Sequence, residues 1–189
     1  MGSLVDVVYD QHRRMFALLA ILEEQIEGYS QGEPFDTYVI EGVLDYVAEY
    51  PDRLHRPIEL RLYEALRGAA PEDAALADAG LEHEHATLSA AARELKNAVI
   101  AARRSAPPPK EWLVSRARAL IEPLRMHMSR EEEAILPACA AKLTPETLAT
   151  LERELGAAGG IPRFEDEEAA YQRLYATVVA QQPLSMRKG

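Results

Sequence analysis

The sequence has a single cysteine, Cys139, and no long apolar run among its 189 residues. One cysteine excludes an internal disulfide framework and a thiolate-rich metal site, and it fits a reducing compartment. No apolar run approaches the roughly 18 residues that a membrane-spanning helix needs. The apolar stretch from Leu4 to Tyr9 is short and is interrupted by Asp6, so we expect no signal peptide. These features predict a soluble cytoplasmic protein.

Basic residues are also few relative to acidic ones. Lysine and arginine total 21 against 31 aspartates and glutamates, giving a formal net charge of -10 and a pI near 5.0. Binding to nucleic acid by counterion release requires a basic face, so we expect no nucleic-acid partner. At 21.0 kDa the chain is long enough for one well-packed core.

Alternating Val/Ile/Tyr runs are absent, whereas leucine, alanine, glutamate and arginine dominate. This composition predicts an all-α protein. Glycine and proline clusters divide residues 1–142 into four long helical segments, which predict an antiparallel up-down-up-down four-helix bundle. Residues 143–189 predict a helical extension with two short helices, a break at 156–162 and a flexible tail beyond Pro183. The four segments are 3–28, with Ser3 as N-cap; 35–66, kinked at Pro51 or Pro57; 71–104; and 110–141.

Four of the five histidines fall on the apolar seams of these helices. Two of them are followed four residues later by a glutamate, a spacing that places both side chains on one face of a helix. Buried polar residues are costly unless something binds them, and imidazole with carboxylate suits zinc, iron or manganese. Four imidazoles and two carboxylates exceed one closed zinc site but suit two metals bridged by carboxylates. The candidate metal ligands are His12, His55, Glu59, His85, His127 and Glu131.

The segments around these residues resemble the hemerythrin-like (HHE cation-binding) domain family over about residues 1–140. The resemblance implies a bundle holding a non-haem di-iron centre, with His12 and His55 on one iron and His85 and His127 on the other. It implies that Glu59 and Glu131 bridge the irons, although zinc or manganese would accept most of these ligands. The motifs are 10–13 (DQHR), 50–59 (YPDRLHRPIE), 81–86 (LEHEHA) and 127–133 (HMSREEE).

One departure from the family bears on function. Oxygen-carrying hemerythrins place two histidines one turn apart on the third helix, but the positions one turn either side of His85 are Leu81 and Ser89. The second iron would lack one protein ligand, a position that water or Glu82 could fill. An open position suits oxygen, peroxide or nitric oxide as the small ligand.

Other interpretations stay open at this stage. His83 lies about 200° around the helix from His85 and is expected to face solvent. Glu132 is expected in a solvated acidic run, with a role beside the metal as the alternative. The function is either redox chemistry at a di-iron centre, oxygen or iron sensing without turnover, or a structural bundle with another metal.

Overall fold

The computed structural model describes residues 3–34, 36–74, 81–102, 109–159 and 161–180. Helices account for nearly all of these residues and no strand occurs among them, which confirms the predicted all-α class. The elements are α1 (Leu4–Gln31), α2 (Thr37–Tyr50), the π-helical turn η1 (Pro51–His55), α3 (Arg56–Ala69), α4 (Pro71–Ala74), α5 (Leu81–Ala102), α6 (Lys110–Arg130), the π-helical turn η2 (Glu131–Ile135), α7 (Leu136–Lys142), α8 (Pro145–Gly159) and α9 (Ile161–Ala180).

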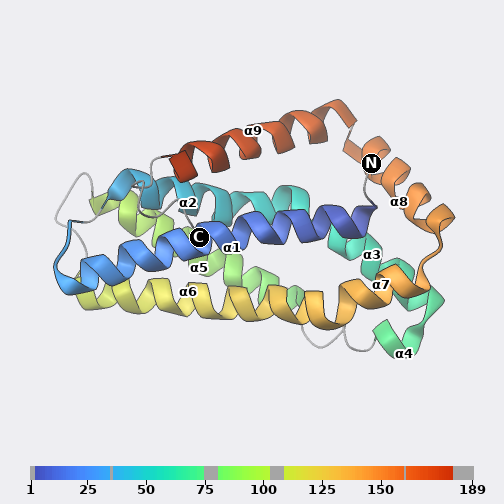
Figure 1. Cartoon of the computed structure of the whole chain (residues 1–189), viewed down its shortest axis with the longest axis horizontal. Coiled ribbons are helices and arrows are strands. Elements are labelled where there is room, and N and C mark those ends of the chain that lie inside the picture. The colour runs from blue at the N-terminus through green and yellow to red at the C-terminus, as the bar shows by residue number, and fades with distance from the viewer. Residues whose placement is uncertain (1–2, 35, 75–80, 103–108, 160, 181–189) are drawn as a thin grey trace.

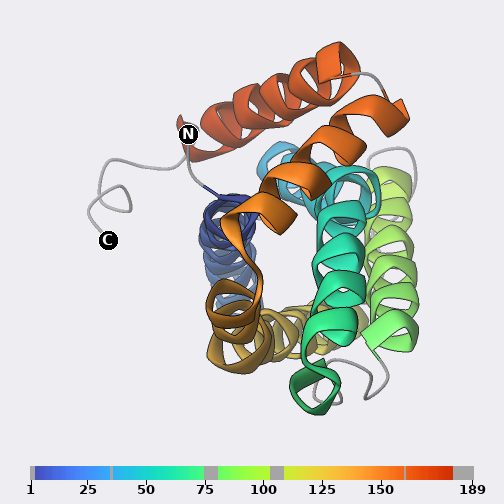
Figure 2. The same ribbon diagram turned by 90° about the vertical axis from the view of Figure 1, so that its right-hand side faces the viewer.

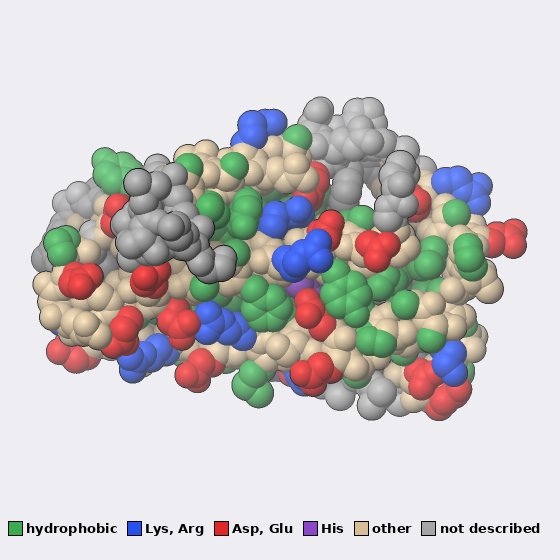
Figure 3. All heavy atoms as spheres, in the orientation of Figure 1, with side chains coloured by type: hydrophobic (Ala, Val, Ile, Leu, Met, Phe, Trp, Pro, Cys, Tyr) green, Lys and Arg blue, Asp and Glu red, His purple; other side chains and the backbone are tan. Residues whose placement is uncertain are grey.

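The long helices form a bundle (Figure 1). Helix α1 packs against α2 and α6, and α5 packs against the other side of the same two helices. Figure 2, which looks along the bundle, shows α8 crossing one end and α9 lying outside α1 and α2. Acidic and basic side chains are interspersed along α1 and α6 on the face shown in Figure 3. No helix within the described ranges is long and apolar enough to cross a membrane.

Helix α1 begins where the sequence predicts and ends later. Ser3 is the N-cap: its Oγ accepts from the Asp6 N–H at 3.3 Å, and its own N–H donates to Asp6 Oδ2 at 2.7 Å. The predicted end at Gly28 was wrong, because the helix continues to Gln31. Gly32 takes the left-handed conformation with φ 98° and closes the helix through a hydrogen bond to the Gly28 carbonyl.

Two π-helical turns interrupt the segments that carry the His-x-x-x-Glu pairs. In each turn one backbone bond spans five residues, from the Arg56 N–H to Pro51 and from the Leu136 N–H to Glu131. Each turn is followed two residues later by a proline, Pro57 or Pro137. A proline lacks the N–H of the next α-helical bond and its ring collides with the carbonyl four residues back, which favours local widening. The predicted irregularity near Pro51 and Pro57 is therefore confirmed.

One predicted segment includes residues that the structure does not describe, and one other predicted boundary differs. The third segment contains the short helix α4 and the long helix α5, while residues 75–80 and 103–108 lie outside the described part of the chain. The broad break predicted at 156–162 was wrong, because α8 extends to Gly159 and α9 already begins at Ile161. Pro162 is the second residue of α9, where a missing N–H costs nothing. The tail predicted beyond Pro183 also lies outside the described residues.

Two apolar clusters fill the bundle and leave a polar layer between them. Met15, Leu54 and Leu124 belong to the larger cluster in the middle of the bundle. Val8, Ile58 and Ile135 belong to the smaller cluster near α7 and α8. The predicted metal ligands on α1, η1, α3, α5, α6 and η2 lie at the boundary between these clusters, so the polar layer is built into the core.

Candidate metal centre

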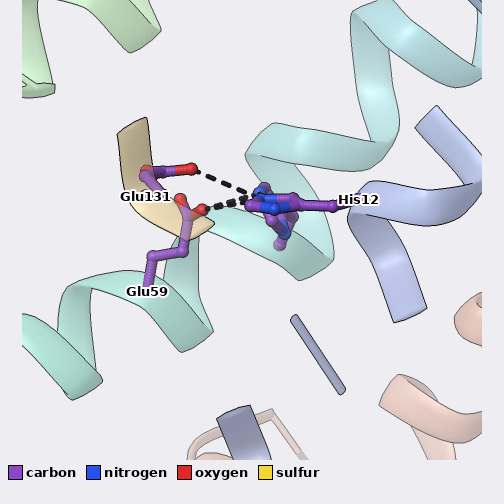
Figure 4. Close-up of side chains that lie close together, drawn as sticks. His12, Glu59 and Glu131 are labelled. Atoms are coloured by element: carbon purple, nitrogen blue, oxygen red, sulfur yellow. Dashed lines mark hydrogen bonds and ion pairs between the residues drawn. The ribbon is translucent and has the colours of Figure 1, made fainter. Parts of the chain in front are cut away.

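The structure brings the six predicted ligand residues together. Glu59 and Glu131 extend from α3 and η2 towards the imidazole of His12 on α1 (Figure 4). His12 Nε2 lies 3.3 Å from Glu131 Oε2, 3.7 Å from Glu59 Oε1 and 3.1 Å from His55 Nε2. The distance between His55 Nε2 and Glu59 Oε1 is 2.6 Å. These four residues form one group that could hold a metal ion.

A second group lies beside the first and shares a carboxylate with it. His85 Nε2 and His127 Nε2 are 2.8 Å apart, and His127 Nε2 is 3.3 Å from Glu131 Oε1. Glu59 reaches across as well, because its Oε2 lies 3.3 Å from His85 Nε2. Glu131 therefore belongs to both groups, and the second group has one residue fewer than the first.

The cluster is almost entirely buried. His12, Glu59 and Glu131 are fully buried, and His55 and His127 are 3% and 2% exposed. His85 is the most accessible ligand candidate, with a side chain 12% exposed. Solvent therefore reaches the second group more readily than the first.

Three histidines have their outer ring nitrogen held by a neighbouring oxygen. His12 Nδ1 lies 3.0 Å from Glu132 Oε1, His55 Nδ1 lies 2.8 Å from Gln11 Oε1, and His127 Nδ1 lies 3.1 Å from Glu84 Oε2. Glutamate carboxylates and amide oxygens accept hydrogen bonds, so they favour the tautomer with the proton on Nδ1. That tautomer leaves the Nε2 lone pair of each ring directed into the cluster.

The interior of the cluster then contains acceptors facing acceptors. With Nδ1–H donated outward, the inner nitrogens of His12, His55 and His127 have no hydrogen to donate to Glu59 or Glu131. Both oxygens of Glu59 and Oε2 of Glu131 are buried and receive no hydrogen bond as long as these imidazoles are neutral, although imidazole nitrogens lie within 3.7 Å of them. Such an arrangement requires a cation at its centre, either protons or metal ions. The donor set of imidazole nitrogens and carboxylate oxygens fits a pair of transition-metal ions.

The metal-free cluster meets this requirement with a proton on His12. Burial alone would lower the pKa of His12, but hydrogen bonds to Glu131 and Glu59 and their charges outweigh it and raise the pKa to about 9. Burial likewise acts to raise the pKa of Glu59, yet the charge of His55 and the close approach of the His12, His55 and His85 imidazoles hold it well below its ordinary value. The negative charge of Glu59 is thus retained for a cation.

A family model described as the hemerythrin HHE cation-binding domain matches residues 3–139. The chain belongs to this hemerythrin HHE family. The match covers α1 to α7 up to Cys139 and includes all six ligand candidates, and it confirms the resemblance drawn from the motifs. The chain matches no curated protein and no solved structure. Membership of the HHE family, together with the buried histidine and glutamate cluster, indicates a metal-binding site.

Several residues that contact the histidine and glutamate cluster were not predicted from the sequence. Gln11 and Glu84 hold the outer nitrogens of His55 and His127, and Tyr63 donates a 2.6 Å hydrogen bond to Glu131 Oε1. Burial and the charges of Glu59 and Glu131 raise the pKa of Tyr63, so its hydroxyl stays protonated as the donor. Gln11 and Glu84 directly precede His12 and His85 within the motifs 10–13 and 81–86, which offered a sequence signal, whereas Tyr63 lies 68 residues from its partner.

Other predictions for single residues near the cluster differ in their outcome. The principal interpretation of Glu132 as part of a solvated run was wrong: its carboxylate contacts His12, and its carbonyl accepts a 3.4 Å hydrogen bond from Tyr9. His83 is exposed, as predicted from its helix face. Cys139 is buried, which raises the pKa of its thiol to about 11. The side chain of Glu82 lies outside the described part of the structure.

Proposed function

We propose that the protein is a non-haem di-iron protein that binds or reacts with oxygen, peroxide or nitric oxide. The observation that carries the proposal is the cluster of four imidazole Nε2 atoms and two carboxylates in a core layer. Three of the four outer ring nitrogens, those of His12, His55 and His127, already have partners. His12 and His55 would hold one iron, His85 and His127 the other, and Glu59 and Glu131 would bridge them. A bound iron pair supplies Lewis-acid and one-electron chemistry.

The chain's own residues set the conditions for that chemistry. Gln11, Glu84 and Glu132 fix the orientation of three imidazoles, and Tyr63 fixes one oxygen of Glu131. The apolar clusters on both sides exclude bulk water from the layer. The second group contains fewer protein ligands and the more exposed His85, so we place the small ligand at that iron.

We also infer the finer architecture. Residues 1–142 would form an antiparallel up-down-up-down bundle from α1, α2 with α3, α5, and α6 with α7. This topology is supported by the packing of neighbouring helices and by four ligand-bearing segments that meet in one layer. Residues 143–189 would form an extension to this bundle.

The experiment is to load the purified protein with ferrous iron without oxygen and then to oxidise it. We expect two irons per chain by elemental analysis and oxo-bridge charge-transfer bands in the absorption spectrum. His127→Ala should lose iron, whereas His83→Ala, which removes an exposed histidine of α5, should retain both ions. Iron content no greater than that of the unfolded chain, or exclusive retention of zinc, would refute the proposal.

Sensing without turnover is a second candidate because α9 is tied to the helices that carry the site. Arg14, two residues after His12, forms an ion pair with Glu168 of α9. Tyr50, which directly precedes η1, donates a 2.7 Å hydrogen bond to Glu168 Oε2. Hydrogen exchange of residues 161–180 should then change when iron binds. Identical protection with and without iron would eliminate this candidate.

A further inference from the structure

A small cavity lies next to the histidines and has one polar corner. It is lined by His55, His85 and His127. The space available to the centre of a water-sized molecule is about 20 Å³, which suits a ligand of a few atoms. Its walls are otherwise mainly apolar, formed by Met15, Val47, Leu88, Leu124 and Met128. The polar corner consists of Ser89, Asp52 and Arg56.

Hydrogen bonds fix the direction of the Ser89 hydroxyl. Ser89 Oγ lies 2.9 Å from Asp52 Oδ1. The Asp52 carboxylate also forms ion pairs with Arg93 at 3.0 Å and with Arg56 at 3.3 Å. A carboxylate paired with two guanidinium groups is an acceptor, so the Ser89 hydroxyl must be the donor of the bond between them. Its proton is therefore committed to Asp52.

The hydrogen bond to Asp52 also determines which hydrogen-bond role Ser89 can take towards a ligand. A hydroxyl that has donated its hydrogen retains lone pairs and acts only as an acceptor. Ser89 is 7% exposed, so bulk water does not compete freely for those lone pairs. Hydrogen peroxide carries O–H donors, whereas oxygen and nitric oxide carry none. A donor ligand gains a hydrogen bond in this cavity that the diatomic ligands cannot form.

We infer that Ser89, oriented by Asp52, is a specificity residue that favours hydrogen peroxide over oxygen and nitric oxide at this centre. The inference rests on the proposed metal function and names the small ligand among the three that it allows. Arg93 and Arg56 contribute by holding Asp52 in place, because without them the hydroxyl would be free to turn. Ser89 acts through one hydrogen bond to the ligand and needs no change in the metal ligands.

The test compares two ligands on the iron-loaded full chain. Stopped-flow absorption gives the second-order rate constant for hydrogen peroxide with the diferrous protein, and titration of the same protein gives the dissociation constant for nitric oxide. We expect Ser89→Ala to lower the peroxide rate constant about tenfold, the effect of one ordinary hydrogen bond, and to leave nitric oxide affinity unchanged. The smaller side chain leaves the ion pairs of Asp52 with Arg56 and Arg93 intact.

Thr87→Ala is the matched control. Thr87 lies on the same helix and is exposed, and its hydroxyl donates to the His83 carbonyl at 2.9 Å, so its removal should change neither measurement. Equal losses for peroxide and nitric oxide in Ser89→Ala, or no loss for either, would overturn the inference while leaving the metal function standing. A wild-type protein that binds no iron, or whose spectrum responds to neither ligand, would overturn the proposed function itself.

Discussion

The metal-free protein should lose stability as the pH rises from about 6.5 to 9. His12 is protonated within the buried cluster, and its pKa is raised from 6.5 to about 9. A group whose pKa is higher in the folded than in the unfolded state contributes stability that is complete below the unfolded pKa and disappears as the pH passes the folded pKa. With ~1.4 kcal/mol per pH unit, the window from 6.5 to about 9 corresponds to ~3 kcal/mol.

The other shifted groups of the cluster and core act outside this window. The lowered pKa of Glu59 contributes stability that is lost only as the pH falls below the ordinary glutamate value of 4.5. Burial raises the pKa of Cys139 from 9.0 to about 11, so its contribution changes only above the upper limit. Metal ions compete with the proton on His12, so iron affinity should rise with pH over the same range in which the metal-free fold weakens.

The assay is urea denaturation of chelator-treated protein at several pH values. Trp112, the single tryptophan, packs partly buried against the larger apolar cluster and reports unfolding by fluorescence. His12→Gln should flatten the profile between pH 6.5 and 9, and His83→Gln, which removes an exposed histidine, should leave it as in the wild type. A wild-type free energy of unfolding that stays constant or increases across this window would refute the reasoning.

Three further predictions follow from single contacts. Glu59→Gln should reduce the iron content measured by elemental analysis from two ions per chain towards one, because an amide cannot replace a bridging carboxylate. Glu133→Gln, on the exposed side of η2, should retain both ions. Equal iron content in the two variants would contradict the bridging role of Glu59. Gln11→Leu removes the acceptor of His55 Nδ1 and should weaken iron binding about 10- to 100-fold in chelator competition, with Gln31→Leu at the exposed end of α1 as control. Gly42→Ala should lower the free energy of unfolding in urea denaturation by about 1–3 kcal/mol, because the new Cβ would lie 2.7 Å from Val178 Cγ2. Gly68→Ala places its Cβ in open space and should stabilise α3 by up to about 1 kcal/mol.

The sequence was sufficient to predict the helical class, the family and the residues that meet in the polar layer. The helical class follows from composition and the family from the motifs, whereas the ligand set depends on local periodicity. His55 with Glu59 and His127 with Glu131 lie one turn apart, and His12 and His85 occupy apolar seams. The end of α1 was misjudged because Gly28 and Gly32 both fit a helix stop, and only the left-handed φ of Gly32 decides between them. The supporting contacts were not predictable, since Glu84, Glu132 and Tyr63 meet their partners through tertiary packing.

The π-helical turns link that local pattern to the site. An α-helix places residues four apart on one face, and this spacing is enough to align His55 with Glu59. The same regular geometry fixes how that face is rotated relative to the rest of the helix. One π turn adds a residue to the local period and therefore rotates everything after it. Because η1 ends at His55, it rotates His55 and Glu59 relative to the apolar stripe of α2. The turn η2 begins at Glu131, so it leaves His127 in register with α6 and rotates α7 relative to the ligand pair. Pro57 and Pro137 each lie two residues after a π turn and favour it, so residues outside the ligand set contribute to positioning the ligand-bearing segments.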